Sequence, residues 1–202
     1  MTFDVIMADP PWRYDSPRAM VGSRGRGAIP GIERVTQVDV SAHYPTMSLD
    51  EIKAMKVAAL AARDAFLFLW TTGPFLADGS AADVARAWGF RPSTVLTWAK
   101  AKPDGTPSMK TGHWFRSASE HIIFALRGAP RRPAGWDALP TWSGLPRLPR
   151  HSEKPDAFFR LAERFGTGSC LELFARGGPR GPRWSVWGNE ATPAPGVAED
   201  KK

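Results

Sequence analysis

The sequence predicts an α/β fold in which helices cover a parallel or mixed β-sheet. Short apolar runs alternate along the chain with amphipathic segments of helical period, which is the pattern of strand–helix–strand units. Two predicted strands, 93–98 and 120–126, follow one another without a helix between them, so we expect one antiparallel pairing. A length of 202 residues and a hydrophobic content of 43% suit one domain with an ordinary core.

Six strands are predicted from apolar runs that stop at turn-forming residues. The first, 3–8, ends abruptly at Asp9-Pro10-Pro11, because proline lacks the N–H that a sheet ladder requires. The second, 65–70, is followed by a Thr-Thr-Gly-Pro segment that breaks it. The complete set is 3–8, 65–70, 93–98, 120–126, 169–175 and 184–187.

Three helices are predicted from the signals at their ends. Ser48 and Glu51 form a capping box, which opens a helix that runs through Leu60. The other two helices stop at a glycine and are 81–88, before Gly89, and 155–165, before Gly166, with Pro155 as the first helical residue.

The composition restricts the class of protein. Cys170 is the only cysteine, which excludes an internal disulfide framework and fits a reducing cytosol. No apolar run approaches the roughly 18 residues of a membrane span, and the N-terminus lacks the basic segment of a signal peptide. We therefore expect a cytoplasmic protein with one domain over 1–190 and a disordered tail over 191–202. Most of the nine tryptophans, such as Trp88 and Trp187, are expected in the core.

Asp9-Pro10-Pro11-Trp12 is the most informative segment of the sequence. In open α/β sheets, ligands bind outside the carboxyl ends of the strands, where this segment lies. The carboxylate and the carbonyls of prolines that lack N–H groups form a cluster of acceptors, which suits an exocyclic amino group with two N–H donors. Trp12 adds a flat ring on which a base can stack. The alternative is an ordinary turn at a strand end, with Trp12 in the core.

This segment resembles the catalytic signature of amino-group methyltransferases that use S-adenosylmethionine. Its Asp-Pro-Pro-Trp form, placed first in the chain, resembles the adenine-N6 methyltransferase family of the eukaryotic mRNA adenosine methyltransferase catalytic subunit and its bacterial and phage relatives. Further segments match this family in the same order over 3–190, and they are 44–48 (YPTMS), 68–70 (FLW), 88–90 (WGF), 98–100 (WAK), 111–114 (TGHW), 120–121 (EH), 152–156 (SEKPD), 172–176 (ELFAR) and 188–190 (GNE).

The resemblance implies a Rossmann-like methyltransferase fold with a mixed, mostly parallel sheet and helices on both of its faces. The motif order is permuted, so that the catalytic motif comes first and the cofactor motifs come last. Asp9 and the Pro10 carbonyl would accept the two amino N–H groups of the base, within a catalytic motif that includes Pro11. Trp12 and Tyr44 would hold the base by stacking.

Two further groups of residues match the nucleic-acid side and the cofactor side of the family's site. The implied substrate contacts are Lys100, His113 and Glu120, and the implied cofactor contacts are Ser152, Lys154, Glu172, Leu173, Phe174, Arg176, Asn189 and Glu190. Lys154 would lie near the cofactor's carboxylate, and Arg176 and Asn189 at its ribose and adenine end. For His113 the alternative is loop packing. For Glu172, a carboxylate in an apolar strand, the alternative is a structural hydrogen-bond anchor.

The implied reaction is methyl transfer from S-adenosylmethionine to the N6 amine of adenine by direct in-line displacement, on a flipped or unpaired base. S-adenosylhomocysteine is the product, and no metal is implied. The partner is nucleic acid, DNA in preference to RNA, and a homodimer stays open. The alternatives are RNA methylation or a catalytically silent nucleic-acid-binding partner of another methyltransferase, against which the intact motif and Lys154 speak.

The positive charge of the chain is concentrated in loops. The formal net charge is +7, but segments 13–34, 98–117, 127–154 and 176–183 are all strongly basic, which leaves the rest of the chain mildly acidic. We expect all four segments around the carboxyl ends of the strands, as a phosphate-binding rim.

Overall fold

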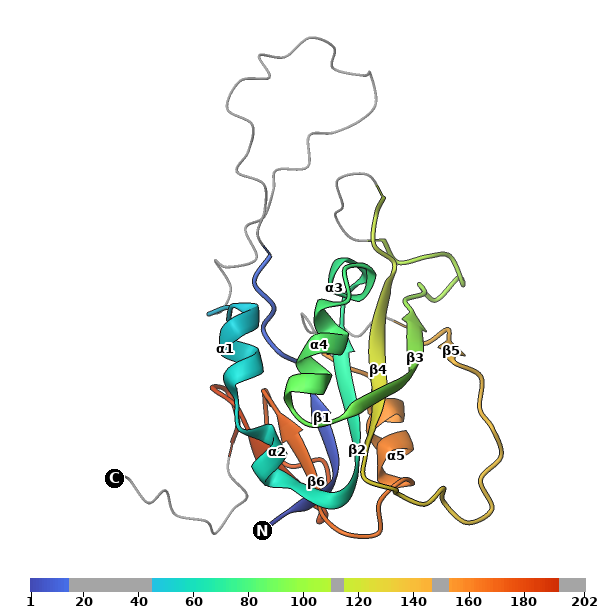
Figure 1. Ribbon diagram of the computed structural model, residues 1–202. Coiled ribbons are helices and arrows are strands. Elements are labelled where there is room, and N and C mark those ends of the chain that lie inside the picture. The colour runs from blue at the N-terminus through green and yellow to red at the C-terminus, as the bar shows by residue number, and fades with distance from the viewer. Residues whose placement is uncertain (15–44, 110–114, 147–152, 193–202) are drawn as a thin grey trace, which may run out of the picture.

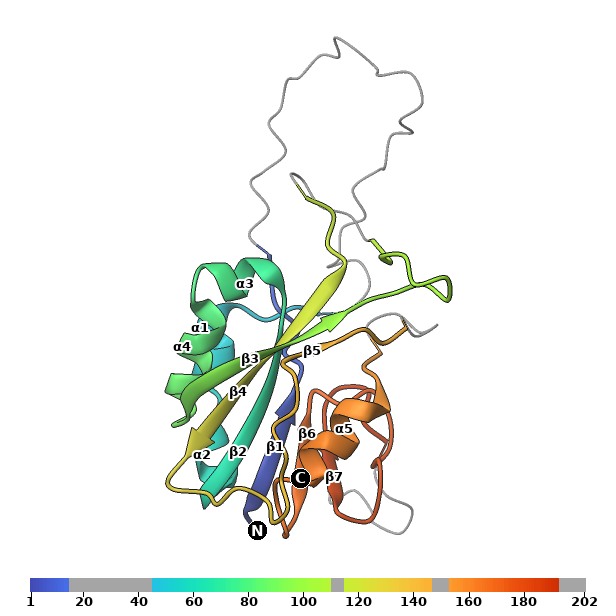
Figure 2. The ribbon, with the colours of Figure 1, turned by 90° about the vertical axis from the view of Figure 1, so that its right-hand side faces the viewer.

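A computed structural model describes residues 1–14, 45–109, 115–146 and 153–192, which form a seven-stranded sheet with helices packed on it (Figures 1 and 2). The strands are β1 (Phe3–Ala8), β2 (Ala61–Thr71), β3 (Arg91–Ala99), β4 (Ser119–Arg127), β5 (Trp142–Ser143), β6 (Cys170–Leu173) and β7 (Trp184–Trp187). The helices are α1 (Leu49–Ala54), α2 (Val57–Leu60), α3 (Gly73–Ala77), α4 (Ser80–Ala87) and α5 (Asp156–Glu163).

The sheet is mixed and mostly parallel, as predicted. Its strand order is β5-β3-β4-β2-β1-β6-β7. Among the described strands, β4 alone runs against its neighbours, because it pairs antiparallel with both β2 and β3 while the other pairings are parallel. The amino end of β4 therefore lies at the same edge of the sheet as the carboxyl ends of the other strands. We call this edge the carboxyl edge.

Helices cover both faces of the sheet. Figure 2 shows α1, α3 and α4 on one side and α5 on the other. The alternation of side chains along β1 explains this arrangement, because Ile6 and Ala8 enter the core beneath α1 and α4, whereas Val5 and Met7 enter the core beneath α5. Each face therefore buries one half of a strand that is apolar throughout, as parallel strands covered on both sides require.

The helix predicted from Ser48 through Leu60 is two helices, so this expectation is wrong in its second half. The capping box is present, since Glu51 N–H donates to the Ser48 hydroxyl and the Ser48 N–H donates to the Glu51 carboxylate. The helix ends at Met55 because Ile52 and Val57 are both buried in the core. Five residues apart, they would point about 140° away from each other on one continuous helix.

Other element boundaries also differ from the predictions. The Thr-Thr-Gly-Pro segment ends β2 at Thr71, as predicted. Its Pro74 lies in the first turn of α3, where its missing N–H costs no hydrogen bond. Pro155 is the N-cap of α5 rather than its first helical residue, and α5 ends at Glu163. Gly89 has the left-handed conformation predicted for a residue just past a helix, with a φ of 80°. Strand β5 has only two residues and was not predicted.

One of the basic segments does not lie where the sequence suggested. Arg127 ends β4 and pairs in register with Ala65 near the start of β2, at the edge opposite the carboxyl edge. Arg131 and Arg132 follow it. The expectation that the whole of 127–154 surrounds the carboxyl ends is therefore wrong, because it did not take the reversed direction of β4 into account.

No described helix is long and apolar enough to cross a membrane. Residues 191–192 are described without helix or strand, and 193–202 lie outside the described residues, so the domain boundary at 190 stays a prediction.

The capping box of α1 gives a prediction for stability. Ser48→Ala should lower the free energy of unfolding by about 1 kcal/mol, the usual contribution of an N-cap hydrogen bond. Hydrogen bonds from the Ser48 hydroxyl and N–H lower the pKa of Glu51. The part of the stabilisation that depends on the Glu51 carboxylate is therefore present above its unfolded pKa and lost as the pH falls through the lower folded pKa. Urea denaturation at pH 7 and pH 3 measures both effects. Ser80→Ala is the control, because the N-cap of α4 is Gly79, and an equal loss in that variant would contradict the prediction.

Candidate functional site

The residues singled out by the sequence meet at the carboxyl edge of the sheet. Asp9 directly follows β1, Lys100 follows β3, and Glu172 lies near the end of β6. Glu120 is the second residue of β4, and the reversed direction of this strand brings it to the same edge. Lys154 precedes α5, which crosses the sheet on one face. Segments up to 145 residues apart in sequence thus supply one site.

Four of these side chains form a chain of alternating charge. The Lys154 Nζ atom lies 2.5 Å from Asp9 Oδ2 and 3.3 Å from Glu120 Oε2. The other carboxylate oxygen of Glu120 pairs with Lys100 Nζ. The side chains of Lys154 and Glu120 are only 8% and 12% exposed, whereas that of Asp9 is 32% exposed. The chain therefore ends at a carboxylate that faces solvent.

Burial and charge act in opposite directions on Lys154. Burial alone would lower its pKa, because the charged ammonium loses its hydration. The Asp9 and Glu120 carboxylates outweigh this effect, so the pKa of Lys154 is raised above its ordinary value. Lys154 also lies 5.2 Å from the centre of the Trp70 ring. It is a fixed cation that holds the Asp9 carboxylate in place.

Lys100 and Glu120 are more enclosed than their matched family positions implied. The Lys100 side chain is 4% exposed, pairs with Glu120, and lies with its Nζ atom 4.7 Å from the centre of the Trp98 ring. Its positive charge is paired with Glu120 inside the protein. Direct contact of Lys100 or Glu120 with nucleic acid stays a prediction, and both residues act here on the Lys154–Asp9 pair.

The loop after β1 is tied down by its backbone. Asp9 N–H donates to the Leu173 carbonyl of β6 at 3.4 Å, and Trp12 N–H donates to the Pro10 carbonyl at 2.9 Å. The Pro11 carbonyl accepts from Met47 N–H at 2.8 Å. The carbonyls of Pro10 and Pro11 therefore each accept one backbone hydrogen bond already. Each carbonyl oxygen has a second lone pair, so each keeps one acceptor site.

Trp12 is a core residue in this structure. It is 6% exposed, its Nε1 donates to the Trp70 carbonyl at 3.1 Å, and its ring stacks on Phe75 with centres 5.0 Å apart. One ring face is thus occupied, and base stacking by Trp12 stays a prediction. Tyr14, which the sequence did not single out, is 40% exposed beside the same Phe75 and shares a hydrogen bond with Thr72. Tyr44, His113 and Ser152 lie outside the described residues.

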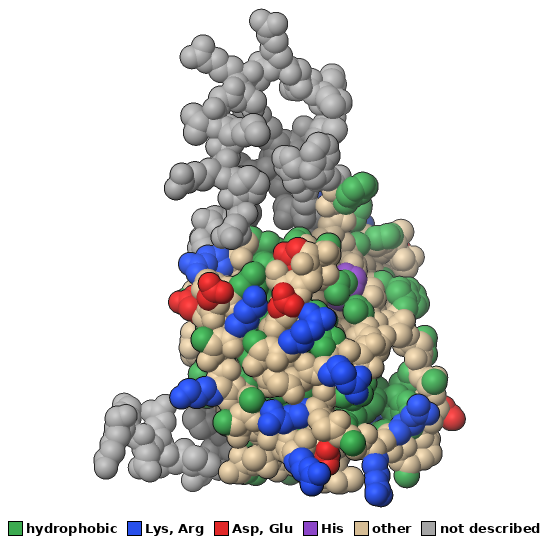
Figure 3. Space-filling view, viewed as in Figure 1, with side chains coloured by type: hydrophobic (Ala, Val, Ile, Leu, Met, Phe, Trp, Pro, Cys, Tyr) green, Lys and Arg blue, Asp and Glu red, His purple; other side chains and the backbone are tan. Residues whose placement is uncertain are grey.

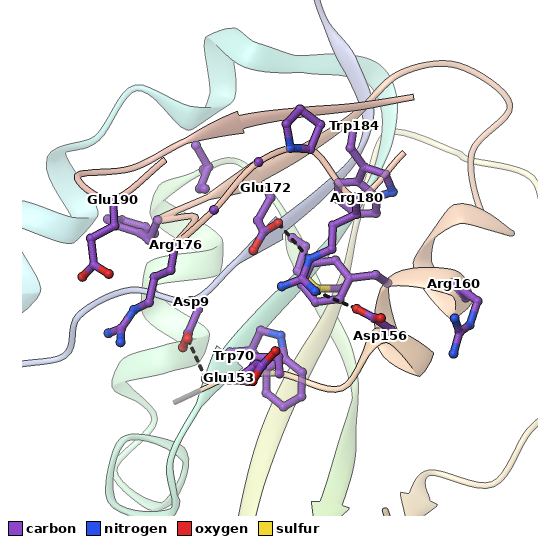
Figure 4. A pocket seen from close by; sticks show the side chains of 18 of the residues that line it. Asp9, Trp70, Glu153, Asp156, Arg160, Glu172, Arg176, Arg180, Trp184 and Glu190 are labelled. Atoms are coloured by element: carbon purple, nitrogen blue, oxygen red, sulfur yellow. Dashed lines mark hydrogen bonds and ion pairs between the residues drawn. The ribbon is translucent and has the colours of Figure 1, made fainter. Parts of the chain in front are cut away.

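A pocket of about 520 Å³ opens between the ends of β1 and β6 and the helix α5 (Figure 4). It brings together most of the predicted cofactor contacts, but Asn189 is not among its lining residues. The lining residues are Met7, Asp9, Trp70, Glu153, Lys154, Asp156, Phe159, Arg160, Glu163, Glu172, Leu173, Phe174, Arg176, Gly177, Gly178, Pro179, Arg180, Trp184 and Glu190.

Glu172 has a partner, as the cost of burying a carboxylate requires. Arg180 Nε lies 3.4 Å from Glu172 Oε2, and Arg180 Nη1 lies 2.6 Å from Asp156 Oδ1 (Figure 4). The guanidinium also covers the Phe159 ring at 4.0 Å. Burial raises the pKa of Glu172, and Arg180 opposes that rise. The sequence did not single out Arg180, although its basic loop, 176–183, was a signal for it.

The loops after β6 and β7 touch at the rim of the pocket. Phe174 has a φ of 63°, a left-handed conformation that is unusual for an aromatic residue. A Cβ atom on Gly188 would lie 2.5 Å from the Ala175 carbonyl oxygen, so only glycine fits there. Trp187 is 52% exposed and meets the Phe174 ring edge-on, which corrects its assignment to the core. These contacts place Phe174, Arg176 and Glu190 around one opening.

No group of three or more His, Cys, Asp or Glu side chains with metal-ligand geometry is found within the described ranges.

Comparison with known proteins gives one family match and several similar proteins. The model of the MT-A70 family matches residues 3–190. The chain is 31% identical over 191 residues to the Type II methyltransferase M.MunI of Mycoplasma sp, with 93% of this chain and 77% of the relative covered.

Two eukaryotic proteins are also similar. The N(6)-adenosine-methyltransferase MT-A70-like protein of Drosophila melanogaster is 29% identical over 194 residues. The human N(6)-adenosine-methyltransferase catalytic subunit METTL3 is 27% identical over 194 residues. Each alignment covers 93% of this chain but only 27% and 28% of the respective relative. The chain thus spans about a quarter of the length of these two relatives.

The Arg180–Glu172 pair gives a prediction for the pH dependence of stability. Arg180→Met removes the charge that opposes the raised pKa of Glu172, so that pKa should rise further. The variant should lose about 2 kcal/mol at pH 7. The loss should be smallest at low pH, where Glu172 is protonated in both proteins and only the other contacts of Arg180 are lost. It should grow as the pH rises through the raised pKa of Glu172. Denaturant unfolding over pH 4–8 measures it.

The control for this prediction is the double variant Glu172→Gln/Arg180→Met. This variant lacks the Glu172 carboxylate, so its loss of stability relative to the wild type should not grow with pH in the same way. A loss in Arg180→Met that is equal at every pH would mean that Arg180 acts by packing on Phe159 alone.

Proposed function

The chain belongs to the MT-A70 family, and from this premise we propose that it transfers the methyl group of S-adenosylmethionine to the N6 amine of adenine in nucleic acid. We propose DNA in preference to RNA. The observation that carries the proposal is the Asp9 carboxylate, which Lys154 holds at the wall of a cofactor-sized pocket. An acceptor fixed in that position can bind and orient an amino group.

The pocket suits S-adenosylmethionine by size and charge. Six carboxylates and four cationic side chains line it, and this negative balance favours a ligand whose sulfonium and ammonium outweigh its carboxylate. Trp70 lines the pocket and its buried Nε1 has no acceptor among the described residues, so an oxygen of a ligand would satisfy it. When bound, S-adenosylmethionine supplies a methyl group that its positively charged sulfur already activates.

We assign the cofactor to the residues that share this opening. Lys154 is the cation for the carboxylate of the cofactor, and Arg176 is the cation at its ribose end. Leu173 and Phe174 form an apolar wall of the pocket. Ser152, Asn189 and Glu190 complete the predicted set. Glu172 keeps a double role in this assignment, because it lines the pocket while Arg180 holds it.

Asp9 and Pro10 act on the amino group of the base. Lys154 occupies Asp9 Oδ2, which leaves Oδ1 to accept one amino N–H. The second lone pair of the Pro10 carbonyl accepts the other. Two such hydrogen bonds fix the plane of the amine and direct its nitrogen at the methyl group, which is catalysis by positioning and electrostatics. The base must leave its stack first, at a cost of a few kcal/mol.

Glu120 and Lys100 are positioning residues in this proposal. Glu120 bridges the two lysines, so that Lys154 has a carboxylate on either side and cannot rotate freely. The preference for DNA is supported by how much of each relative the alignment covers. It covers 77% of M.MunI, a Type II methyltransferase, but only 28% of METTL3, an N(6)-adenosine-methyltransferase subunit. RNA methylation is the second candidate. The complete Asp9–Lys154–Glu120 geometry favours an enzyme over a silent partner.

Asp9→Asn tests the proposed function most simply. It keeps the shape of the side chain but replaces one acceptor oxygen with a donor group. Formation of N6-methyladenine should fall at least 100-fold, on the order of 3 kcal/mol in activation free energy. Mass spectrometry of nucleosides, after incubation of DNA and RNA with S-adenosylmethionine, measures the product. Binding of S-adenosylhomocysteine should change little. The thermal midpoint should fall, because the buried Lys154 loses one of its two carboxylates, but Glu120 still pairs with it and the protein should stay folded at the assay temperature.

Asp50→Asn is the matched control, because Asp50 is exposed in the first turn of α1 and does not line the pocket. It should retain full activity. Absence of N6-methyladenine on both nucleic acids with the wild-type protein, while S-adenosylhomocysteine binds, would refute the enzyme and favour the silent partner. Product on RNA alone would refute the preference for DNA.

A further inference from the structure

A second basic surface lies at the end of the sheet opposite the carboxyl edge. We call it the far-end surface and define it by Arg86, Arg91 and Arg127, which line a shallow pocket of about 420 Å³. Arg131 and Arg132 follow in the chain and are exposed. In Figure 3, Lys and Arg side chains gather over the lower half of the face turned toward the viewer, with few acidic side chains between them. None of these arginines lines the catalytic pocket.

The fold places these arginines side by side. Arg91 starts β3 and pairs in register with Leu126, the neighbour of Arg127 at the end of β4. Arg86 comes from the last turn of α4. The left-handed Gly89 turns the chain between α4 and β3. A Cβ atom on Gly89 would lie only 3.0 Å from Arg127 Nη1, so this turn packs closely against Arg127. The surface is thus built by a helix end and two strand ends, and it is not a flexible loop.

The charge of the far-end surface is largely uncompensated. Arg86 pairs with Asp83 at 2.7 Å, and the nearby Asp64 carboxylate accepts Ala129 N–H at 2.7 Å. Within the described parts of the chain, Arg91 and Arg127 form no ion pair. Arginine presents a rigid fork of donors that matches phosphate, and it is weakly hydrated. An open, shallow pocket of this kind suits the phosphates of a backbone better than an enclosed small ligand.

We propose that the far-end surface binds backbone phosphates of the nucleic acid at a distance from the methylated base, an inference that rests on the proposed function. Glu120 is the second residue of β4 and Arg127 is its last, and seven steps of about 3.3 Å separate them by roughly 23 Å. A duplex advances about 3.4 Å per base pair, so that span corresponds to about 7 base pairs. The surface lies on the other face of the sheet from α5, which lengthens the path, so we expect contact only with substrates longer than about 10 base pairs.

The double variant Arg91→Gln/Arg127→Gln tests this inference, with the exposed pair Arg131→Gln/Arg132→Gln as a second variant that leaves the turn at Gly89 untouched. Methylation is compared on a duplex of about 40 base pairs and on one of about 8, with the target in the same flanking sequence. On the long substrate, KM should rise about 5- to 10-fold and kcat should stay unchanged. On the short substrate, KM and kcat should both stay unchanged. Arg91→Lys/Arg127→Lys is the matched control and should keep most of the long-substrate affinity.

Binding of the labelled long duplex, measured by fluorescence anisotropy at several salt concentrations, gives a readout without catalysis. Loss of two phosphate contacts should reduce the slope of log K against log salt by about 1.8. An unchanged slope and an unchanged long-substrate KM would overturn the inference, and so would an equal loss on both lengths. If the wild type makes no methylated product but the slope changes as expected, the proposed function fails and the phosphate surface stands.

Discussion

Lys154 between two carboxylates is the interaction on which the rest of the site depends. A buried ammonium is costly unless it is paired and hydrogen-bonded, and Asp9 and Glu120 meet that requirement from two different strands. Asp9 can follow β1 because the prolines end the strand there. Glu120 reaches the same edge only because β4 runs antiparallel. The reversed strand in an otherwise parallel sheet is thus part of the architecture of the candidate site, since it supplies the carboxylate that keeps Lys154 beside Asp9.

Local signals predicted much of the fold. β1 and β7 have the predicted boundaries, and the capping box at Ser48 and the turn at Gly89 are where the sequence placed them. These features depend on residues that are adjacent in sequence. The break at Met55 depends on which side chains the sheet can accept, and β5 exists through its pairing with β3, so neither has a local signal.

The residues of the candidate site were predicted about as completely as the elements of the fold. Asp9 and six of the predicted cofactor residues line one pocket because parallel strands end at one edge. Arg180, the left-handed Phe174 and the burial of Trp12 follow from contacts between distant segments, which no spacing in the sequence encodes. The charge pattern failed for the same reason. Most of 13–34 lies outside the described residues. For 127–154 the direction of β4 decides at which end of the sheet Arg127 lies.

A crystal structure of the protein with S-adenosylhomocysteine and an adenine-containing oligonucleotide would show whether Lys154 and Asp9 act as proposed. We expect the cofactor product in the pocket beside α5 and Lys154 Nζ still within hydrogen-bond distance of Asp9 Oδ2. The amino group of the base should lie on Asp9 Oδ1 and the Pro10 carbonyl. A complex in which Lys154 has left Asp9 for another partner, or in which the amino group meets neither acceptor, would contradict the proposed roles.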